Sequence, residues 1–192
     1  MMVKICGITN REDALAAVEA GASAIGFNFY RESPRYISPT GAAMVAEKIP
    51  ANVWKVGVFV NETPETIAKI VLDAGLDVAQ LHGSSEARGV RVWRAMPPNA
   101  QIAGSLAEVV EAVLIDSTDG KSGGSGKTWD WSQAPHLEQK IIIAGGLDAD
   151  NVRVAIEQAQ PWGVDACSRI EKSPGLKDHD KMRRFIHAAL NS

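Results

Sequence analysis

Residues 3–9 read Val3-Lys4-Ile5-Cys6-Gly7-Ile8-Thr9, a short and mostly apolar run that ends in a thiol and a glycine. A run of this length and β-branched character is typical of a buried strand. Asn10 follows, with Asp13 three residues on, and this spacing is close to a capping box, which signals the start of a helix. The stretch therefore predicts a β-strand, a turn and a helix, with Cys6 at the carboxyl end of the strand.

The same unit recurs along the chain, because short β-branched runs alternate with segments of helical period. We expect strands at Val3–Cys6, Ala24–Phe29, Trp54–Val60, Val78–Leu81, Val90–Ala95, Ala112–Ile115, Ile141–Ala144 and Val164–Cys167. Mostly apolar strands with helices between them imply parallel pairing. Eight such units, without a G-x-G-x-x-G after the first strand, favour a closed (β/α)8 TIM barrel over an open doubly wound sheet.

The helical segments carry their own start signals. We expect helices after Asn10, at Ala42–Ile49, after Thr63-Pro64, at Ser105–Val110, at Asp130–Ala134, after Asp148 and after Asp178. Ser84–Gly89, between the fourth and fifth strands, is too short for a full helix. At about 24 residues per unit the barrel is smaller than the usual ~250 residues. We therefore expect one domain over residues 1–192, a small barrel with a trimmed helix between strands 4 and 5.

Composition and charge narrow the class of protein. A net charge of -3 provides no basic field for nucleic acid or for an anionic membrane surface. No apolar run approaches the ~20 residues of a membrane span. The two cysteines, Cys6 and Cys167, lie far apart and form no CxxC motif, which fits neither a disulfide scaffold nor a zinc site. We expect a cytoplasmic protein with no bound metal and with neither nucleic acid nor membrane as a partner.

The active site of a (β/α)8 barrel is built at the carboxyl ends of its strands. That rule selects Cys6, Asn28, Arg35, Val60-Asn61, His82, Arg94, Asp116, Gly145-Gly146 and Ser168. Structural interpretations stay open for the main candidates. A cysteine that ends an apolar strand is often a small buried hydrophobe, and a strand-end aspartate often caps a turn. Arg35 also fits a solvated loop charge, and His82 fits a hydrogen-bonded residue of the rim better than a metal ligand.

Glycine-rich segments add a second kind of signal. Gly123–Lys127 lacks the spacing of a nucleotide P-loop and fits a lid over a bound ligand. Gly145-Gly146 precedes an expected helix, and Ser168 follows the last strand. Loops after strands 7 and 8 form the recurrent phosphate site of this fold, because backbone N–H groups there point at the anion. Within a barrel, these residues predict phosphate binding.

Several segments resemble phosphoribosylanthranilate isomerase of tryptophan biosynthesis. They are Lys4–Thr9, Gly26-Phe27, Ser33–Pro39, Gly57–Phe59, Gln80–Gly83, Asp116, Gly123–Lys127, Gly145–Leu147, Asn151-Val152 and Pro174–Asp178. The similarity runs over nearly the whole chain, and the opening motif and the Ser-Pro-Arg-Tyr segment are specific. The resemblance implies a cofactor-free (β/α)8 aldose–ketose isomerase, either monomer or homodimer, with a small phosphorylated substrate.

The implied reaction is an Amadori rearrangement. It converts N-(5′-phosphoribosyl)anthranilate to 1-(2-carboxyphenylamino)-1-deoxyribulose 5-phosphate. By position, the resemblance implies Cys6 as general base, Asp116 as general acid and Arg35 as the anchor of the anthranilate carboxylate. The implied phosphate site contains Gly145, Gly146 and Ser168.

One segment departs from the family pattern. After the last strand the family has Ser-Ser-Gly followed by Val-Glu, whereas this chain has Cys167-Ser168-Arg169-Ile170-Glu171. Arg169 stands at the glycine, where a side chain restricts φ and crowds the anion, or else adds a charged contact to it. We place Arg169 and His82 among the substrate-binding residues.

Two other functions stay open. The related isomerases of histidine biosynthesis use paired aspartates on strands 1 and 5, and Cys6 at the end of the first strand disfavours them. A non-catalytic barrel that binds a phosphorylated ligand is favoured only by Arg169.

Overall fold

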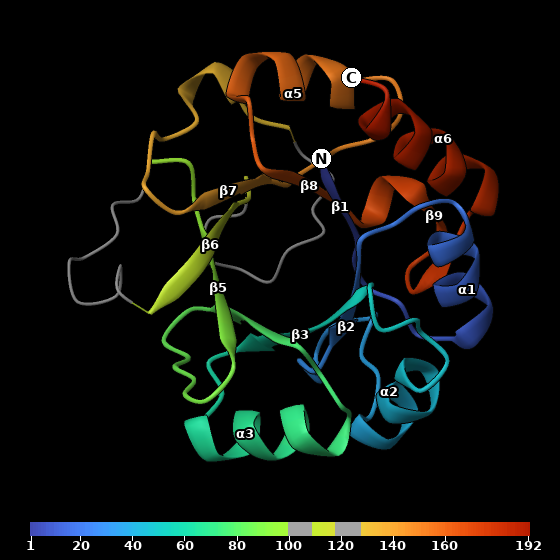
Figure 1. The fold of residues 1–192 in the computed structure, drawn as a ribbon, viewed down its shortest axis with the longest axis vertical. Coiled ribbons are helices and arrows are strands. Elements are labelled where there is room, and N and C mark those ends of the chain that lie inside the picture. Colours follow the sequence, from blue (N-terminus) through green and yellow to red (C-terminus); the bar gives the residue numbers. More distant parts are fainter. Residues whose placement is uncertain (100–108, 118–127) are drawn as a thin grey trace.

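The computed structural model describes residues 1–99, 109–117 and 128–192. Within them, parallel strands close into a barrel in chain order from β1 to β8 (Figure 1). They are β1 (Met2–Ile5), β2 (Ala24–Asn28), β3 (Trp54–Val60), β4 (Val78–His82), β5 (Arg91–Met96), β6 (Val110–Ile115), β7 (Lys140–Ile143) and β8 (Gly163–Ala166). The barrel confirms the predicted fold, and every strand lies within two residues of its predicted bounds.

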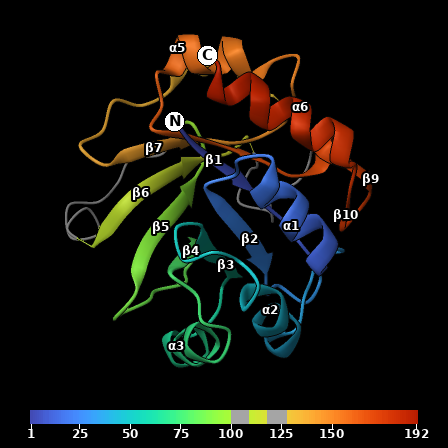
Figure 2. The same cartoon turned by 45° about the vertical axis from the view of Figure 1, so that its right-hand side comes forward.

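Helices surround the barrel on the outside (Figures 1 and 2). They are α1 (Arg11–Glu19), α2 (Pro39–Ala46), α3 (Pro64–Asp73), α5 (Val152–Ala159) and α6 (His179–Leu190), with the 3-10 helices η1 (Trp131–Gln133) and η2 (Ser168–Ile170). The predicted cap of α1 is confirmed, because Asn10 Oδ1 accepts the backbone N–H of Asp13 at 2.8 Å. Asp178 likewise accepts two backbone N–H groups at the start of α6. Within the described ranges, no helix is long and apolar enough to cross a membrane.

Two helix starts differ from the prediction. α2 begins three residues early, because Ser38 caps it by accepting the backbone N–H of Gly41 and Pro39 fits its first turn. α5 begins late: Asp148 does not cap it but accepts the backbone N–H groups of Asp150 and Asn151 in a turn just before the helix.

The connections also test the prediction. No helix lies between β4 and β5, which confirms the prediction that the helix of this unit is trimmed. In its place is a short loop, and Arg94 donates to the carbonyls of Gly83 (3.2 Å) and Ser85 (2.7 Å) in it. The expected helix at Ser105–Val110 lies mostly outside the described residues, and the expected lid at Gly123–Lys127 lies wholly outside them. A small antiparallel hairpin, β9 (Glu171–Ser173) with β10 (Leu176–Lys177), was not predicted.

The core has two parts. One lies between the barrel and its helices, and the predicted stripe of α6 packs fully buried into it through Met182, Phe185, Ile186 and Ala189. The other fills the barrel interior, where inward side chains such as Trp93 and Leu114 are apolar. Side chains alternate along a strand. By this alternation Lys4 on β1, Gln80 on β4 and Asp165 on β8 point inward, so a buried polar layer lies just below the carboxyl ends of the strands.

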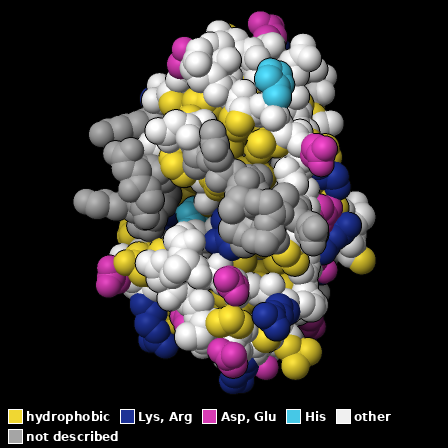
Figure 3. Space-filling view, turned by 90° about the vertical axis from the view of Figure 1, so that its left-hand side faces the viewer, with side chains coloured by type: hydrophobic (Ala, Val, Ile, Leu, Met, Phe, Trp, Pro, Cys, Tyr) yellow, Lys and Arg dark blue, Asp and Glu magenta, His cyan; other side chains and the backbone are white. Residues whose placement is uncertain are grey.

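One face of the molecule is mixed in charge. On the face shown in Figure 3, the described lysine, arginine and acidic side chains are interspersed rather than gathered by sign. This distribution agrees with the small net charge of -3.

Candidate active site

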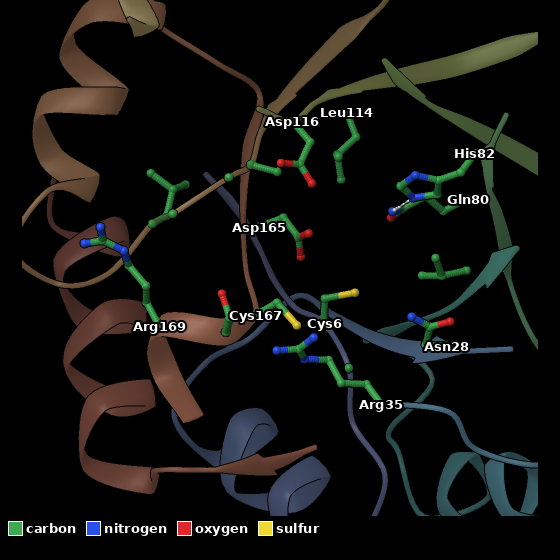
Figure 4. Close-up of a pocket in the computed structure, with 17 residues that line it drawn as sticks. Cys6, Asn28, Arg35, Gln80, His82, Leu114, Asp116, Asp165, Cys167 and Arg169 are labelled. Atoms are coloured by element: carbon green, nitrogen blue, oxygen red, sulfur yellow. Dashed lines mark hydrogen bonds between the residues drawn. The ribbon is translucent and has the colours of Figure 1, made fainter. Parts of the chain in front are cut away.

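A pocket opens at the carboxyl ends of the strands (Figure 4). All the residues to which the sequence assigned a catalytic or binding role line it: Cys6, Arg35, His82, Asp116, Gly145, Gly146, Ser168 and Arg169. Asn28, another strand-end candidate, lines it as well, whereas Asn61 and Arg94 do not. Asn61 adopts a left-handed turn (φ 50°) and accepts the backbone N–H of Ser84, so its role is structural.

Cys6 follows β1 and is held there by its backbone, whose N–H donates to Ala166 O at 2.9 Å. Its thiol is buried and faces the pocket. A hydrogen bond from Cys167 lowers the pKa of the Cys6 thiol well below its usual value, and the charge of Lys4 lowers it further, against the effect of burial. The same hydrogen bond and burial raise the pKa of Cys167. Of these two thiols, Cys6 is the one whose pKa is lowered.

Two glycines make room around this thiol. Gly7 has φ +73°, and a Cβ there would lie 2.7 Å from Arg35 Cδ and 3.0 Å from Cys167 Sγ. A Cβ on Gly26 would lie 2.9 Å from Cys6 Sγ. Neither position accepts a side chain without displacing the groups around the pocket, which explains the glycines at both places.

Lys4 and Asp165 form a buried ion pair below the thiol, with Lys4 Nζ 2.9 Å from Asp165 Oδ1. Burial raises the pKa of Asp165 to about 7, against the effect of Lys4. Burial works to lower the pKa of Lys4, but Asp165 and Cys6 together raise it, so Lys4 stays charged. A charged lysine therefore lies buried next to Asp165, which lines the pocket.

Arg35 is buried and held by a shared carboxylate. Its Nε lies 2.9 Å from Glu171 Oε1 and its Nη2 lies 2.8 Å from Glu171 Oε2. Lys177, which is fully buried, binds Glu171 Oε1 at 2.8 Å. Burial acts to raise the pKa of Glu171, but Arg35 and Lys177 outweigh it and lower that pKa. The hairpin β9–β10 thus fixes one side of the Arg35 guanidinium.

Asp116 follows β6, and its backbone N–H donates to Met96 O at 3.0 Å. Asp116 is buried, with 8% of the residue exposed. Gly145 lies against it at φ +85°, and a Cβ there would lie 2.9 Å from Asp116 Oδ1 and 2.8 Å from Ser117 Oγ. Figure 4 shows the carboxyls of Asp116 and Asp165 and the thiol of Cys6 pointing into the same pocket. Two carboxyls and a thiol therefore share one pocket.

His82 is neutral in this pocket. Burial lowers its pKa to about 4, and the charges of Lys4 and Arg94 act in the same direction. The side-chain amide of Gln80 donates to His82 Nε2 at 3.0 Å. His82 can therefore hydrogen-bond a ligand as a neutral imidazole at physiological pH.

Arg169 lies at the side of the pocket away from Cys6 (Figure 4). Its Nη1 is 2.7 Å from Asp148 Oδ2, and its side chain is 41% exposed. Its φ is not positive, so an arginine replaces the family's glycine here without backbone strain. Gly145 and Gly146 keep positive φ, and Asn151 Nδ2 donates to Gly146 O at 2.8 Å, which fixes the turn before α5.

The sequence reasoning missed Asp165, which lines the pocket, and the buried charged residues Lys4 and Glu171, which hold pocket residues in place. Lys4 and Asp165 carried a signal, because each is a charged residue at an inward position of an otherwise apolar strand. Glu171 carried none, because its role depends on partners far away in sequence. Among the described residues, no group of three His, Cys, Asp or Glu side chains is placed to hold a metal ion.

The closed barrel and the pocket of titratable side chains at the carboxyl ends of its strands place the chain among the (β/α)8-barrel enzymes. A family model described as N-(5'phosphoribosyl)anthranilate (PRA) isomerase matches residues 3–188. The chain belongs to this isomerase family, which confirms the resemblance seen in the sequence to an isomerase of tryptophan biosynthesis.

Relatives and solved structures agree with this assignment. The N-(5'-phosphoribosyl)anthranilate isomerase of Solibacter usitatus is 49% identical, over 98% of this chain and 97% of its own. A structure of monomers generated from the dimeric isomerase of Thermotoga maritima has a TM-score of 0.80 and 36% identity, with 100% of both chains covered. Another solved structure, of a phosphoribosyl anthranilate isomerase in complex with reduced 1-(o-carboxyphenylamino)-1-deoxyribulose 5-phosphate, has a TM-score of 0.81 and 35% identity, also with 100% of both chains covered.

Proposed function

We propose that this chain converts N-(5′-phosphoribosyl)anthranilate to 1-(2-carboxyphenylamino)-1-deoxyribulose 5-phosphate, with Cys6 as general base and Asp116 as general acid. Family membership supports the reaction. The observation that carries the assignment of roles is that the Cys6 thiol, with its lowered pKa, and the buried Asp116 carboxyl line the same pocket. Here an acid and a base can act on one small sugar.

The chemistry requires two proton transfers. Asp116 protonates the ribose ring oxygen, the C1′–O bond breaks, and the nitrogen lone pair forms an iminium. The Cys6 thiolate then removes the proton on C2′; the C–H electrons form the C1′–C2′ double bond, and the iminium π electrons return to nitrogen. The resulting enol tautomerises to the ketone. The cationic iminium favours a thiolate beside it, and an acid and a base held in place contribute much of the rate enhancement.

Two ends of the pocket orient the substrate in this proposal. Glu171 binds Nε and Nη2 of Arg35, so the Nη1 side of the guanidinium would receive the anthranilate carboxylate. At the other end, the turn at Gly145-Gly146 and the segment around Ser168 would bind the phosphate, with Arg169 as a charged contact. Neutral His82 would hydrogen-bond the substrate between these ends.

Two variants test the roles of acid and base. We expect Cys6→Ala and Asp116→Asn to fold like the parent protein and to lose turnover, measured through the anthranilate chromophore. Full activity in either variant would refute the mechanism. Assaying the phosphorylated aminoketose precursor of histidine biosynthesis in parallel tests the related isomerase activity.

Growth provides an independent test of the function. In a host that lacks the isomerase, the gene is expected to restore growth without tryptophan. If folded protein accumulates and growth is not restored, the non-catalytic alternative is correct.

We further infer one domain that acts in the cytoplasm without a cofactor, as a monomer or a homodimer. The match of the family model over residues 3–188 supports the single domain, and the dimeric Thermotoga maritima relative makes a homodimer reasonable. Light scattering on the purified protein measures the oligomeric state directly, and a larger assembly would contradict the inference.

A further inference from the structure

A lysine lies beneath the thiol of Cys6, deep inside the barrel. Lys4 lies on β1 and Cys6 directly follows that strand, two residues further on, so both side chains point to the same side, into the barrel. Lys4 is 0% exposed, and its ammonium is 2.9 Å from Asp165 Oδ1. Burying an ion pair is costly unless its geometry is good, and well-packed apolar residues often serve stability as well. Stability alone therefore gives no reason for a charge at this position.

Gly26 shows how close the lysine comes to the thiol. Cys6 and Lys4 both lie against β2, and a Cβ on Gly26 would be 2.9 Å from Cys6 Sγ and 3.1 Å from Lys4 Cε. Lys4 Cε and Cys6 Sγ therefore both lie next to the space that a side chain at position 26 would fill, and the glycine leaves that space open. The charge of Lys4 accordingly lowers the pKa of the Cys6 thiol.

Other charged or titratable groups around Cys6 come from several elements: Asp165 on β8, Cys167 after β8, Arg35 after β2, Lys177 on β10, His82 on β4 and Asp116 after β6. Arg35 and Lys177 are both engaged by Glu171, at 2.8 Å each. His82 is neutral, because burial lowers its pKa to about 4. Among the neighbouring cations, Lys4 has the largest charge effect on the pKa of the Cys6 thiol, ahead of Lys177.

Asp165 does not neutralise this lysine completely. Burial raises the pKa of Asp165 to about 7, so near neutral pH its carboxyl is only partly ionised. The charge of Lys4 is then shared between this carboxyl and the thiol.

We propose that Lys4 is a positioning residue that keeps Cys6 ionised as a thiolate, with Asp165 fixing the ammonium and Gly26 providing the space for both groups. The inference rests on the proposed role of Cys6 as the base. Lys4 lies below the pocket and acts on the substrate only through the sulfur. Its effect can therefore be measured on the thiol itself, without turnover.

The test measures how the rate of alkylation by iodoacetamide depends on pH. All variants carry Cys167→Ser, which leaves Cys6 as the one cysteine of the chain and keeps a hydroxyl donor beside it. The midpoint is the pH at which the alkylation rate of Cys6 is half its maximum. In Lys4→Met we expect this midpoint to rise by roughly one pH unit or more, as for loss of an opposite charge in contact. That shift is about a tenfold loss of thiolate at a pH below both midpoints. The acidic limb of the kcat/KM profile should move in the same direction, and Lys4→Arg should restore part of the shift.

Three further variants separate charge from structure. Asp165→Asn breaks the same ion pair but keeps the ammonium, so its midpoint should not rise. The double variant Lys4→Met with Asp165→Asn leaves no unpaired buried charge, and it should fold and still show the raised midpoint. Lys55→Met removes another lysine that is paired with an aspartate, at 3.2 Å near the start of β3, and it should leave the midpoint unchanged.

The outcomes are distinct. An unchanged midpoint in both Lys4→Met and the double variant overturns the inference. A rise in Asp165→Asn equal to that in Lys4→Met also overturns it, because disruption rather than charge would then be the cause. A Cys6→Ser variant with full turnover would instead refute the proposed base, whatever the titration shows.

Discussion

The substitution Glu171→Gln tests the buried cluster that holds Arg35. Glu171 accepts from Arg35 Nε at 2.9 Å, from Arg35 Nη2 at 2.8 Å and from Lys177 Nζ at 2.8 Å. The side chain of Glu171 is 4% exposed, that of Arg35 10% and that of Lys177 0%. Glutamine has almost the same size but no charge. The substitution therefore leaves two buried cations without a counter-charge while the packing is kept.

The expected cost follows from that geometry. Breaking a buried ion pair by removing one partner costs about 3–5 kcal/mol, because the remaining charge stays desolvated. A domain of this size loses roughly 2–4 °C of melting temperature for each kcal/mol, so the melting temperature should fall by roughly 10 °C. Arg35 would also lose its fixed orientation, and KM for the substrate should rise.

Urea unfolding at neutral pH measures the free energy of unfolding of the variant and the parent. Asp180→Asn is the matched control: Asp180 pairs with Arg183 at 2.6 Å, but both side chains are more than half exposed, and the midpoint should hardly change. If Glu171→Gln unfolds at the same urea concentration as the parent, the cluster is not a buried electrostatic unit and the reasoning fails.

Three further predictions concern the pocket. Gly145→Ala puts a Cβ 2.9 Å from Asp116 Oδ1, so kcat should fall about tenfold to a hundredfold, whereas Gly75→Ala, at φ +60° with nothing within 4 Å, should lower stability and leave kcat unchanged. The folded-state pKa of His82, about 4, lies below its ordinary value of 6.5, so the folded state binds fewer protons between these values. Stability should therefore fall by roughly 2–3 kcal/mol as pH drops from 6.5 to 4, and His82→Asn should remove that part of the pH dependence in urea titrations. Arg169→Gly should raise KM severalfold with little change in kcat, and an unchanged KM would exclude Arg169 from phosphate binding.

Much of the fold could be predicted because its signals are local. The run at residues 3–9, the cap at Asn10 and the Thr63-Pro64 start of α3 each specify one element through neighbouring residues. The number of such units favoured a barrel. The barrel rule then assigned Cys6 and Asp116 to a single pocket, where the structure places them. Two helix starts were predicted wrongly. α2 begins at Pro39 because Ser38 caps it, and α5 begins late because both Asp148 and Asn151 suit a cap and the turn geometry chooses between them.

The sequence by itself therefore determined the elements, their order and the strand ends at which the pocket residues lie. Only the tertiary structure decided which charges meet. Lys4 and Asp165 are 161 residues apart, and they pair because β1 closes the barrel against β8. Arg35 and Glu171 are 136 residues apart, and they meet because the hairpin after β8 folds back over the loop after β2. The inward position of a side chain follows from alternation along its strand, but its partner depends on how the barrel closes.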